Sequence, residues 1–242
     1  MDEFVPTWVK RQYSPRENWK NKPFTRDDSV FFGKGVLELS ELFTGERSAR
    51  SPAYFRHERF RSAYLLYFLP LQAAKFVALF GQYRQVLASL PRTEINVADL
   101  GAGPGTASIA LLLSLLDHKD ALPTKIVFHW WDAQEPMLRE GKKLLEDFAE
   151  DHPLLKGRIE IRLNVAAWEN AAENSKLRFD LVLVGNVLNE GRSPSQEVRK
   201  ARGRWNELAE LQEDSAEPLE VATPVDSRFE LFEKLRERTG AG

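Results

Sequence analysis

Three glycines and one carboxylate carry the strongest chemical signal in this chain of 242 residues. Gly101, Gly103 and Gly105 stand at alternate positions, and the apolar stretch before them ends at Asp99 and Leu100. Glycine has no Cβ, so such a turn bends sharply and lets a ligand approach its backbone. An apolar helical pattern follows at once, and the first turn of a helix presents free amide N–H groups. The spacing predicts a nucleotide-binding corner of the strand–turn–helix type.

The spacing of the glycines separates the possible cofactors. The dinucleotide fingerprint is G-x-G-x-x-G, whereas this chain has G-x-G-x-G, with Thr106 where the fingerprint needs its last glycine. Asp99 would repel a pyrophosphate and attract a cationic group. S-adenosylmethionine (SAM) has an ammonium group and no phosphate, so the residues favour SAM. A dinucleotide site and an ordinary glycine turn are the alternatives.

A second carboxylate ends the next predicted strand. The aromatic and β-branched run 126–131 is typical of a buried strand, and Asp132 follows it. A helix then starts within 133–138 and runs to about residue 150, with Pro136 suited to its first turn. A carboxylate at this point binds ribose hydroxyls in Rossmann-type sites. The alternatives are a solvated strand end for Asp132 and core packing for Met137.

Two further strands are predicted downstream. The alternating stretch 158–163 indicates a third strand, and Asn164 follows it in a segment without a carboxylate. The apolar run 179–184 suits a central parallel strand. Ligands bind outside the carboxyl ends of such strands, so the exit loop 185–190 should face the reacting group. Its polar candidates, for which loop capping is the alternative, are Asn186, Asn189 and Glu190.

The pattern D-x-G-x-G-x-G resembles motif I of the class I SAM-dependent methyltransferases. The segment 132–138 is similar to their D-x-S-x-x-M-L segment. The resemblance implies that Asp99 contacts the methionine ammonium group through water and that Asp132 binds ribose. In that family an acidic residue often follows the third strand, where this chain has Asn164. The predicted cofactor-binding residues are Asp99, Gly101, Ala102, Gly103, Gly105, Asp132, Ala133, Met137, Asn164 and Asn186.

The stretch from Arg61 to Pro70, followed by a helix and by D-L-G-A-G-P-G-T-A, looks like the Rsm22 family. These methyltransferase-like proteins associate with the small ribosomal subunit. The resemblance covers about residues 55–190 and implies a ribosomal partner. Members of that family commonly carry a cysteine cluster, but this chain has no cysteine, so that feature is not carried over.

The N-terminal part differs in charge from the remainder. Residues 1–95 contain 15 Lys and Arg against 10 Asp and Glu, a net charge of +5 in a chain of net charge −2. Aromatic residues alternate with these cations from Trp8 to Phe32. Such a segment neutralises phosphates and stacks on unpaired bases; the alternative is an extension whose aromatic residues pack on the domain. Two helices follow, 53–69 and 71–90, because Pro70 interrupts the helical pattern.

Several reactions and sites are disfavoured by composition. Methylation of pyrimidine carbon 5 needs a thiolate, and the exit loop lacks the Asn/Asp-Pro-Pro-aromatic sequence of adenine amino-methyltransferases. The four histidines show no ligand spacing, so no metal is expected. The sequence has no run of about 18 apolar residues, so no membrane span is expected, and no secretory signal is recognised. The absence of cysteine fits the cytoplasm.

We therefore expect an α/β fold: a doubly wound, mostly parallel Rossmann-like sheet with an N-terminal helical extension. Five strands can be counted, the fifth at 218–224, against seven in a complete class I methyltransferase. The predicted divisions are a basic aromatic arm at 1–52, a helical cover at 53–92 and a SAM-binding domain at 93–242. The first hypothesis is methyl transfer to RNA, ribosomal RNA above all, with no general base identified. The alternatives are a non-catalytic ribosome-assembly or RNA-binding factor and a small-molecule methyltransferase.

Overall fold

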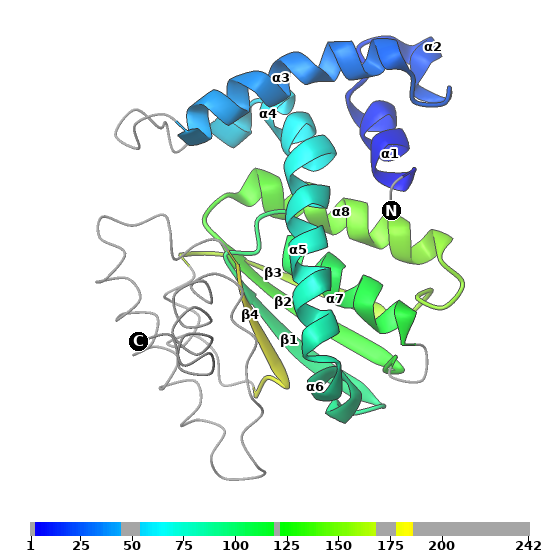
Figure 1. The fold of residues 1–242 in the computed structure, drawn as a ribbon, viewed down its shortest axis with the longest axis vertical. Coiled ribbons are helices and arrows are strands. Elements are labelled where there is room, and N and C mark those ends of the chain that lie inside the picture. Colours follow the sequence, from blue (N-terminus) through cyan, green and yellow to red (C-terminus); the bar gives the residue numbers. More distant parts are fainter. Residues whose placement is uncertain (1–2, 45–53, 119–121, 168–177, 186–242) are drawn as a thin grey trace, which may run out of the picture.

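The computed structural model describes residues 3–44, 54–118, 122–167 and 178–185 (Figure 1). Their centre is a parallel four-stranded sheet with the order β3-β2-β1-β4. The strands are β1 (Glu94–Leu100), β2 (Lys125–Asp132), β3 (Ile159–Val165) and β4 (Leu181–Val184). The helical elements are α1 (Phe4–Tyr13), α2 (Glu17–Lys20), α3 (Arg26–Thr44), η2 (Tyr54–Arg56), α4 (Glu58–Ala63), η3 (Tyr64–Phe68), α5 (Leu69–Gln82), α6 (Arg84–Ser89), α7 (Thr106–Asp117) and α8 (Glu135–Asp151).

The predicted α/β class with a parallel sheet is confirmed. All four described strands follow the predicted stretches closely, because each is an apolar or alternating run with β-branched and aromatic residues. The register aligns Asp99 of β1 with Trp130 of β2, so both side chains lie on the same side of the sheet. The fifth strand and the helices predicted beyond residue 185 lie outside the described residues.

The described helices supply the core on one face of the sheet. Side chains of this face join those of α5, α7 and α8 in one buried cluster. The buried sheet residues in the cluster are Ile95, Val97, Ile126, Phe128, Trp130, Ile161, Leu181 and Leu183. The opposite face has a separate aromatic group, in which the rings of His129, Trp131 and Phe179 contact one another. The glycine turn is thus backed by a rigid, close-packed layer.

The helices α1, α2 and α3 form an N-terminal layer that packs on α8, α4 and η3 (Figure 1). Trp8 of α1 is buried, and its Nε1 donates a hydrogen bond of 2.7 Å to Asp147 Oδ2 of α8. Phe32 of α3 is buried as well, whereas Phe31 remains 46% exposed. For Trp8 and Phe32 the structure therefore supports packing on the domain. The three divisions of the chain stay predictions.

A buried ion pair joins α1 to α3. Lys10 Nζ lies 2.6 Å from Asp28 Oδ2, and both side chains are 3% exposed. Asp28 also accepts hydrogen bonds from the N–H and hydroxyl of Thr25, while the Asp28 N–H donates to the Thr25 hydroxyl. This arrangement is a capping box at the start of α3, in which the backbone N–H groups of Thr25 and Asp28 both find an acceptor. Burial raises the pKa of Asp28, but the donors Lys10 and Thr25 outweigh it and hold that pKa below its usual value.

The expectation that Pro70 separates two helices is wrong. η3 is a π-helical turn in which the Leu69 N–H bonds to the Tyr64 carbonyl, so the wider turn ends where Pro70 enters the first turn of α5. Such bulges relieve the clash of a proline ring with the preceding turn. Among the described residues, the resulting run Glu58–Gln82 is long and apolar enough to cross a membrane by length and composition. Leu65, Leu69 and Phe76 of this run belong to the core, and core helices of folded proteins meet the same criterion.

We predict that Lys10→Met lowers the free energy of unfolding by about 3 kcal/mol, because it leaves Asp28 as a buried charge without its partner. Lys20→Met is the matched control, since Lys20 forms an ion pair with Glu17, which is 87% exposed. That control should lose less than about 1 kcal/mol. Urea unfolding of both variants measures the difference. Equal losses of unfolding free energy in the two variants would contradict a larger contribution from the buried pair.

Candidate functional site

The predicted glycine corner is formed at the carboxyl edge of β1 and β2. Gly101, Gly103 and Gly105 have φ angles of 70°, 52° and 74°, in the left-handed region that glycine favours. The N–H groups of Gly101 and Ala102 both donate to the carbonyl of Trp131, at 2.7 and 3.0 Å. These bonds fasten the turn to the end of β2. The turn leads directly into α7.

Open space adjoins the middle of the turn. A Cβ built on Gly103 would meet no atom within 4 Å. By contrast, a Cβ on Gly105 would lie 2.1 Å from Cζ2 of Trp130, and one on Gly141 of α8 would lie 2.3 Å from the Pro104 carbonyl oxygen. The turn is therefore packed against the sheet and α8 at one end, and Gly103 leaves its backbone accessible to a ligand.

Asp99 lies beneath the turn and is 1% exposed. Its Oδ2 accepts hydrogen bonds from the Ser108 hydroxyl, at 2.6 Å, and from the Ser108 N–H, at 3.2 Å. Burial raises the pKa of Asp99 to about 7; the two Ser108 donors act in the opposite direction, and the negative charge of Asp132 adds to the rise. The Asp99 carboxyl group therefore titrates close to neutral pH.

Asp132 closes the other side of the corner. Its Oδ2 accepts the N–H of Gly103 at 2.9 Å, and its Oδ1 accepts the N–H of Gln134 at 2.7 Å. Burial raises the pKa of Asp132, while these two backbone donors lower it. The carboxylate is thus held in place by the turn itself. Among the described residues, no Lys or Arg forms an ion pair with Asp99 or Asp132.

The other predicted site residues fall in different surroundings. Ala102 is buried within the turn and Ala133 is exposed after β2. Met137 is fully buried in the core, so its side chain packs as the alternative expected. Asn164 of β3 is paired with Trp131 of β2 in the sheet, and its Nδ2 donates a hydrogen bond of 3.3 Å to the Trp130 carbonyl. Asn186 lies outside the described residues.

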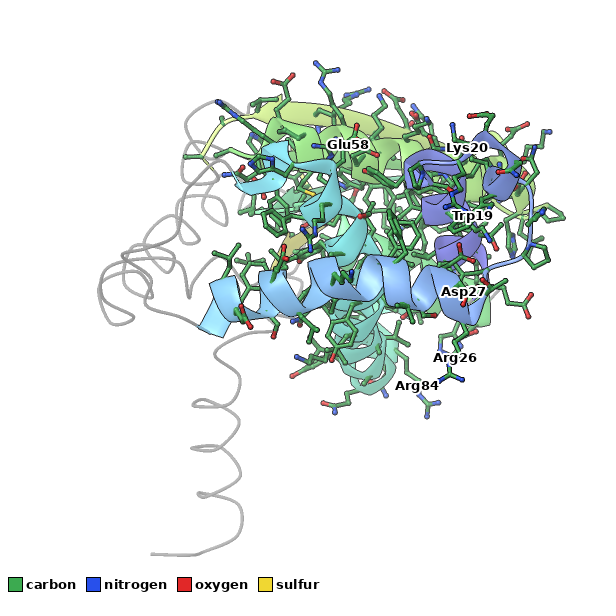
Figure 2. All side chains as sticks on the ribbon, turned by 90° about the horizontal axis from the view of Figure 1, so that it is seen from above. Trp19, Lys20, Arg26, Asp27, Glu58 and Arg84 are labelled. Carbon is green, nitrogen blue, oxygen red and sulfur yellow. The ribbon has the colours of Figure 1, made fainter. Side chains whose placement is uncertain are left out.

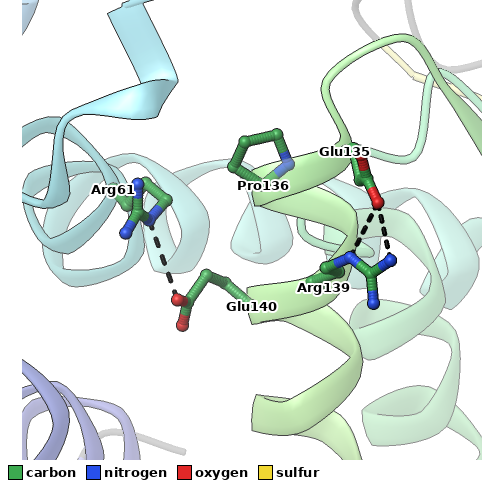
Figure 3. A pocket seen from close by; sticks show the side chains of 5 residues that line it. All are labelled: Arg61, Glu135, Pro136, Arg139 and Glu140. Atoms are coloured by element: carbon green, nitrogen blue, oxygen red, sulfur yellow. Dashed lines mark hydrogen bonds and ion pairs between the residues drawn. The ribbon is translucent and has the colours of Figure 1, made fainter.

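A shallow cavity of about 350 Å³ opens at the start of α8, between that helix and α4 (Figure 3). Arg139 donates to Glu135 Oε1 at 2.6 and 2.8 Å, and Arg61 Nε lies 3.7 Å from Glu140 Oε1. The acidic and basic groups of this cavity are therefore already paired with one another. Among the described residues, no group of three His, Cys, Asp or Glu side chains is arranged to hold a metal ion.

Sequence reasoning missed Ser108, Trp130 and Gly141 as parts of the site. Ser108 stands in the first turn after the last glycine, where a polar residue in an otherwise apolar helix is a usable signal. Trp130 appeared only as one aromatic residue of an apolar strand. Its contact with Ser108 depends on the register of β1 and β2, which no local pattern reveals.

No protein-family model matches this chain, and no curated protein matches it. Ten solved chains match in structure. One, provisionally assigned as a SAM-dependent methyltransferase of Methanococcus maripaludis, is 16% identical with a TM-score of 0.34; the match covers 55% of this chain and 53% of that one, about half of each. Magnesium protoporphyrin IX methyltransferase of Synechocystis with bound SAM is 16% identical, with a TM-score of 0.37 and coverage of 85% and 82%. A provisionally assigned RNA methyltransferase of Pyrococcus horikoshii is 13% identical, with a TM-score of 0.33 and coverage of 71% and 68%.

We predict that Asp99→Asn changes the pH dependence of stability. The folded-state pKa of about 7 exceeds the ordinary value of 3.8, so between these values the folded protein holds a proton that the unfolded chain releases. The wild type should therefore lose stability relative to Asp99→Asn as the pH rises from 4 to 7, by about 4 kcal/mol in the limit. Urea unfolding at pH 4, 5, 6 and 7 measures the difference. Parallel curves for the two proteins would contradict the elevated pKa.

Proposed function

We propose that this protein binds SAM at the corner between Gly103 and Asp132. The observation that carries the proposal is the open space at Gly103, whose N–H is held by the Asp132 carboxylate, with the Asp99 carboxylate buried behind the same turn. Neither carboxylate is paired with a Lys or Arg among the described residues. A pyrophosphate would meet the carboxylate of Asp132 beside the Gly103 N–H, whereas an ammonium or sulfonium group is attracted there. The dinucleotide alternative is disfavoured on the same ground.

The residues present fit such a ligand. Asp132 has both oxygens oriented by backbone N–H groups, and a carboxylate retains further lone pairs for ribose hydroxyls. Both hydrogen bonds that Asp99 accepts from described residues fall on Oδ2, so among these residues Oδ1 is left to accept from a donor such as water. The Asn164 amide is partly committed to the Trp130 carbonyl, but its oxygen is suited to accept the adenine amino group.

When bound, SAM supplies a methyl group that is already electrophilic. The protein then has to hold the donor still, admit an acceptor in line with the carbon–sulfur bond and exclude water. The fastened glycine turn and the oriented Asp132 carboxylate serve the first task. No described residue is assigned as a general base, and of the exit loop 185–190 that should face the acceptor only Gly185 is described.

RNA, ribosomal RNA above all, is the proposed acceptor, in the cytoplasm. The N-terminal layer offers support: Arg11, Lys22 and Arg26 are exposed and form no ion pair with any described residue. Figure 2 places Trp19, Lys20 and Arg26 at α2 and the start of α3. The Arg16 guanidinium lies 4.5 Å from the centre of the Trp19 ring, a pairing of the kind that contacts phosphates and bases.

A non-catalytic RNA-binding or ribosome-assembly factor is the second candidate. It is favoured by the absence of a carboxylate after β3, where Asn164 already uses its amide within the sheet. Such a protein would bind RNA and SAM, or RNA alone, without turnover.

We predict that S-adenosylhomocysteine binds the wild type and that Gly103→Ala reduces its affinity at least tenfold, because the added Cβ enters the open space at the turn. Gly157→Ala is the matched control: Gly157 also has a positive φ and open surroundings, but lies in the turn before β3. Both variants pay a similar backbone strain of about 1 kcal/mol. Calorimetric titration of the three proteins measures binding. No binding to the wild type at millimolar ligand would refute the proposal.

We also predict transfer of labelled methyl groups from SAM to RNA of the small ribosomal subunit, with loss of transfer in Gly103→Ala. Filter binding of radiolabelled RNA measures incorporation. Salt-sensitive RNA binding without incorporation would favour the non-catalytic candidate. Incorporation into a small molecule but not into RNA would favour the small-molecule alternative.

A further inference from the structure

Three side chains behind the glycine turn form a continuous chain of hydrogen bonds. Nε1 of Trp130 donates to the Ser108 hydroxyl at 2.8 Å, and that hydroxyl donates to Asp99 Oδ2 at 2.6 Å. Ser108 and Trp130 are fully buried, and Asp99 nearly so. The three residues come from α7, β2 and β1, the elements that meet at the corner.

The chain of bonds has one direction. An indole N–H can only donate, and a serine hydroxyl has a single hydrogen. Because Ser108 accepts from Trp130, its own hydrogen is free to point to Asp99. A distance of 2.6 Å is typical of a hydroxyl that donates to an ionised carboxylate. Both side chains therefore favour the charged form of Asp99.

Other groups act in the opposite sense. Burial disfavours the charged carboxylate, and Asp132 repels it. Other titratable groups of the surrounding elements lie elsewhere: Lys125 starts β2 and is paired with Glu94 and Glu160, His129 lies on the opposite face, and Asp117 ends α7. On α5, Lys75 is exposed beside Gln72, and on α8, Glu135 is paired with Arg139 and Glu140 with Arg61. β4 has no titratable residue. The ionisation of Asp99 is thus balanced, and the Ser108 hydroxyl is a principal contribution to the charged side.

Trp130 also controls the shape of the turn. Its ring occupies the place where a Cβ on Gly105 would lie, at 2.1 Å from Cζ2. One side chain therefore supports the last glycine of the turn and orients the hydroxyl that reaches Asp99.

We infer that Ser108 and Trp130 are positioning residues, which orient the Asp99 carboxyl group and favour its ionised form, the form that attracts the ammonium group of the cofactor. The inference rests on the proposed binding of SAM. Neither residue touches the open space at Gly103; each acts through Asp99. Cofactor affinity should then depend on pH near neutrality, rising as Asp99 loses its proton.

The test is the affinity for S-adenosylhomocysteine measured calorimetrically between pH 6 and 8.5. In the wild type, affinity should rise with pH through a midpoint near neutrality. Ser108→Ala removes one donor, so the midpoint should move up by about one pH unit and the affinity at pH 7 should fall about fivefold, with recovery at pH 8.5. Ser114→Ala is the matched control, since Ser114 is also buried in α7 but donates to the Ala110 carbonyl.

Trp130→Phe provides a second test, because it removes the N–H donor while it keeps an aromatic ring in the core. Its midpoint should move in the same direction by a smaller amount. Thermal unfolding first establishes that each variant is folded. A uniform loss of affinity at every pH, or an unchanged midpoint in Ser108→Ala and Trp130→Phe, would overturn the inference. If the wild type binds no S-adenosylhomocysteine, the proposed function itself fails.

Discussion

The buried carboxylate of Asp99 is the constraint on which the site depends. It stands at the end of β1 with almost no exposure to water, and its hydrogen bonds come from the first turn of α7. A charge in this place is unfavourable unless donors surround it. The strand, the glycine turn and the helix are therefore held together by a group whose burial is itself costly. That combination suits a binding site better than a purely structural corner.

The N-terminal layer is fixed to the rest of the fold by buried polar contacts. Its helices pack on α8, α4 and η3, and Trp8 of α1 donates a hydrogen bond to Asp147 of α8. The buried pair Lys10–Asp28 then fixes α1 against α3. The fold divides the lysines and arginines of this layer into two groups: buried and paired ones, such as Lys10, and exposed ones, such as Arg26. Only the second group is open to the RNA contact that we propose.

The parallel sheet and both carboxylates at the corner could be predicted from the sequence, because strand periodicity, glycine spacing and the acidic strand ends are local signals. The continuous helix across Pro70 could not, since a π-turn depends on packing around residues 64–68. The roles of Trp130 and Ser108 were equally hidden, because their contact requires β1 and β2 to be in register. Met137 matched the methyltransferase pattern, but the fold places its side chain in the core.

The most direct test of the central claim is a crystal structure of the protein with S-adenosylhomocysteine. The account predicts that the ligand lies against the backbone of Gly103, with its ribose hydroxyls on Asp132 and its ammonium group directed to Asp99. Electron density for the ligand at another place, or a phosphate-containing dinucleotide bound at the same corner, would contradict it.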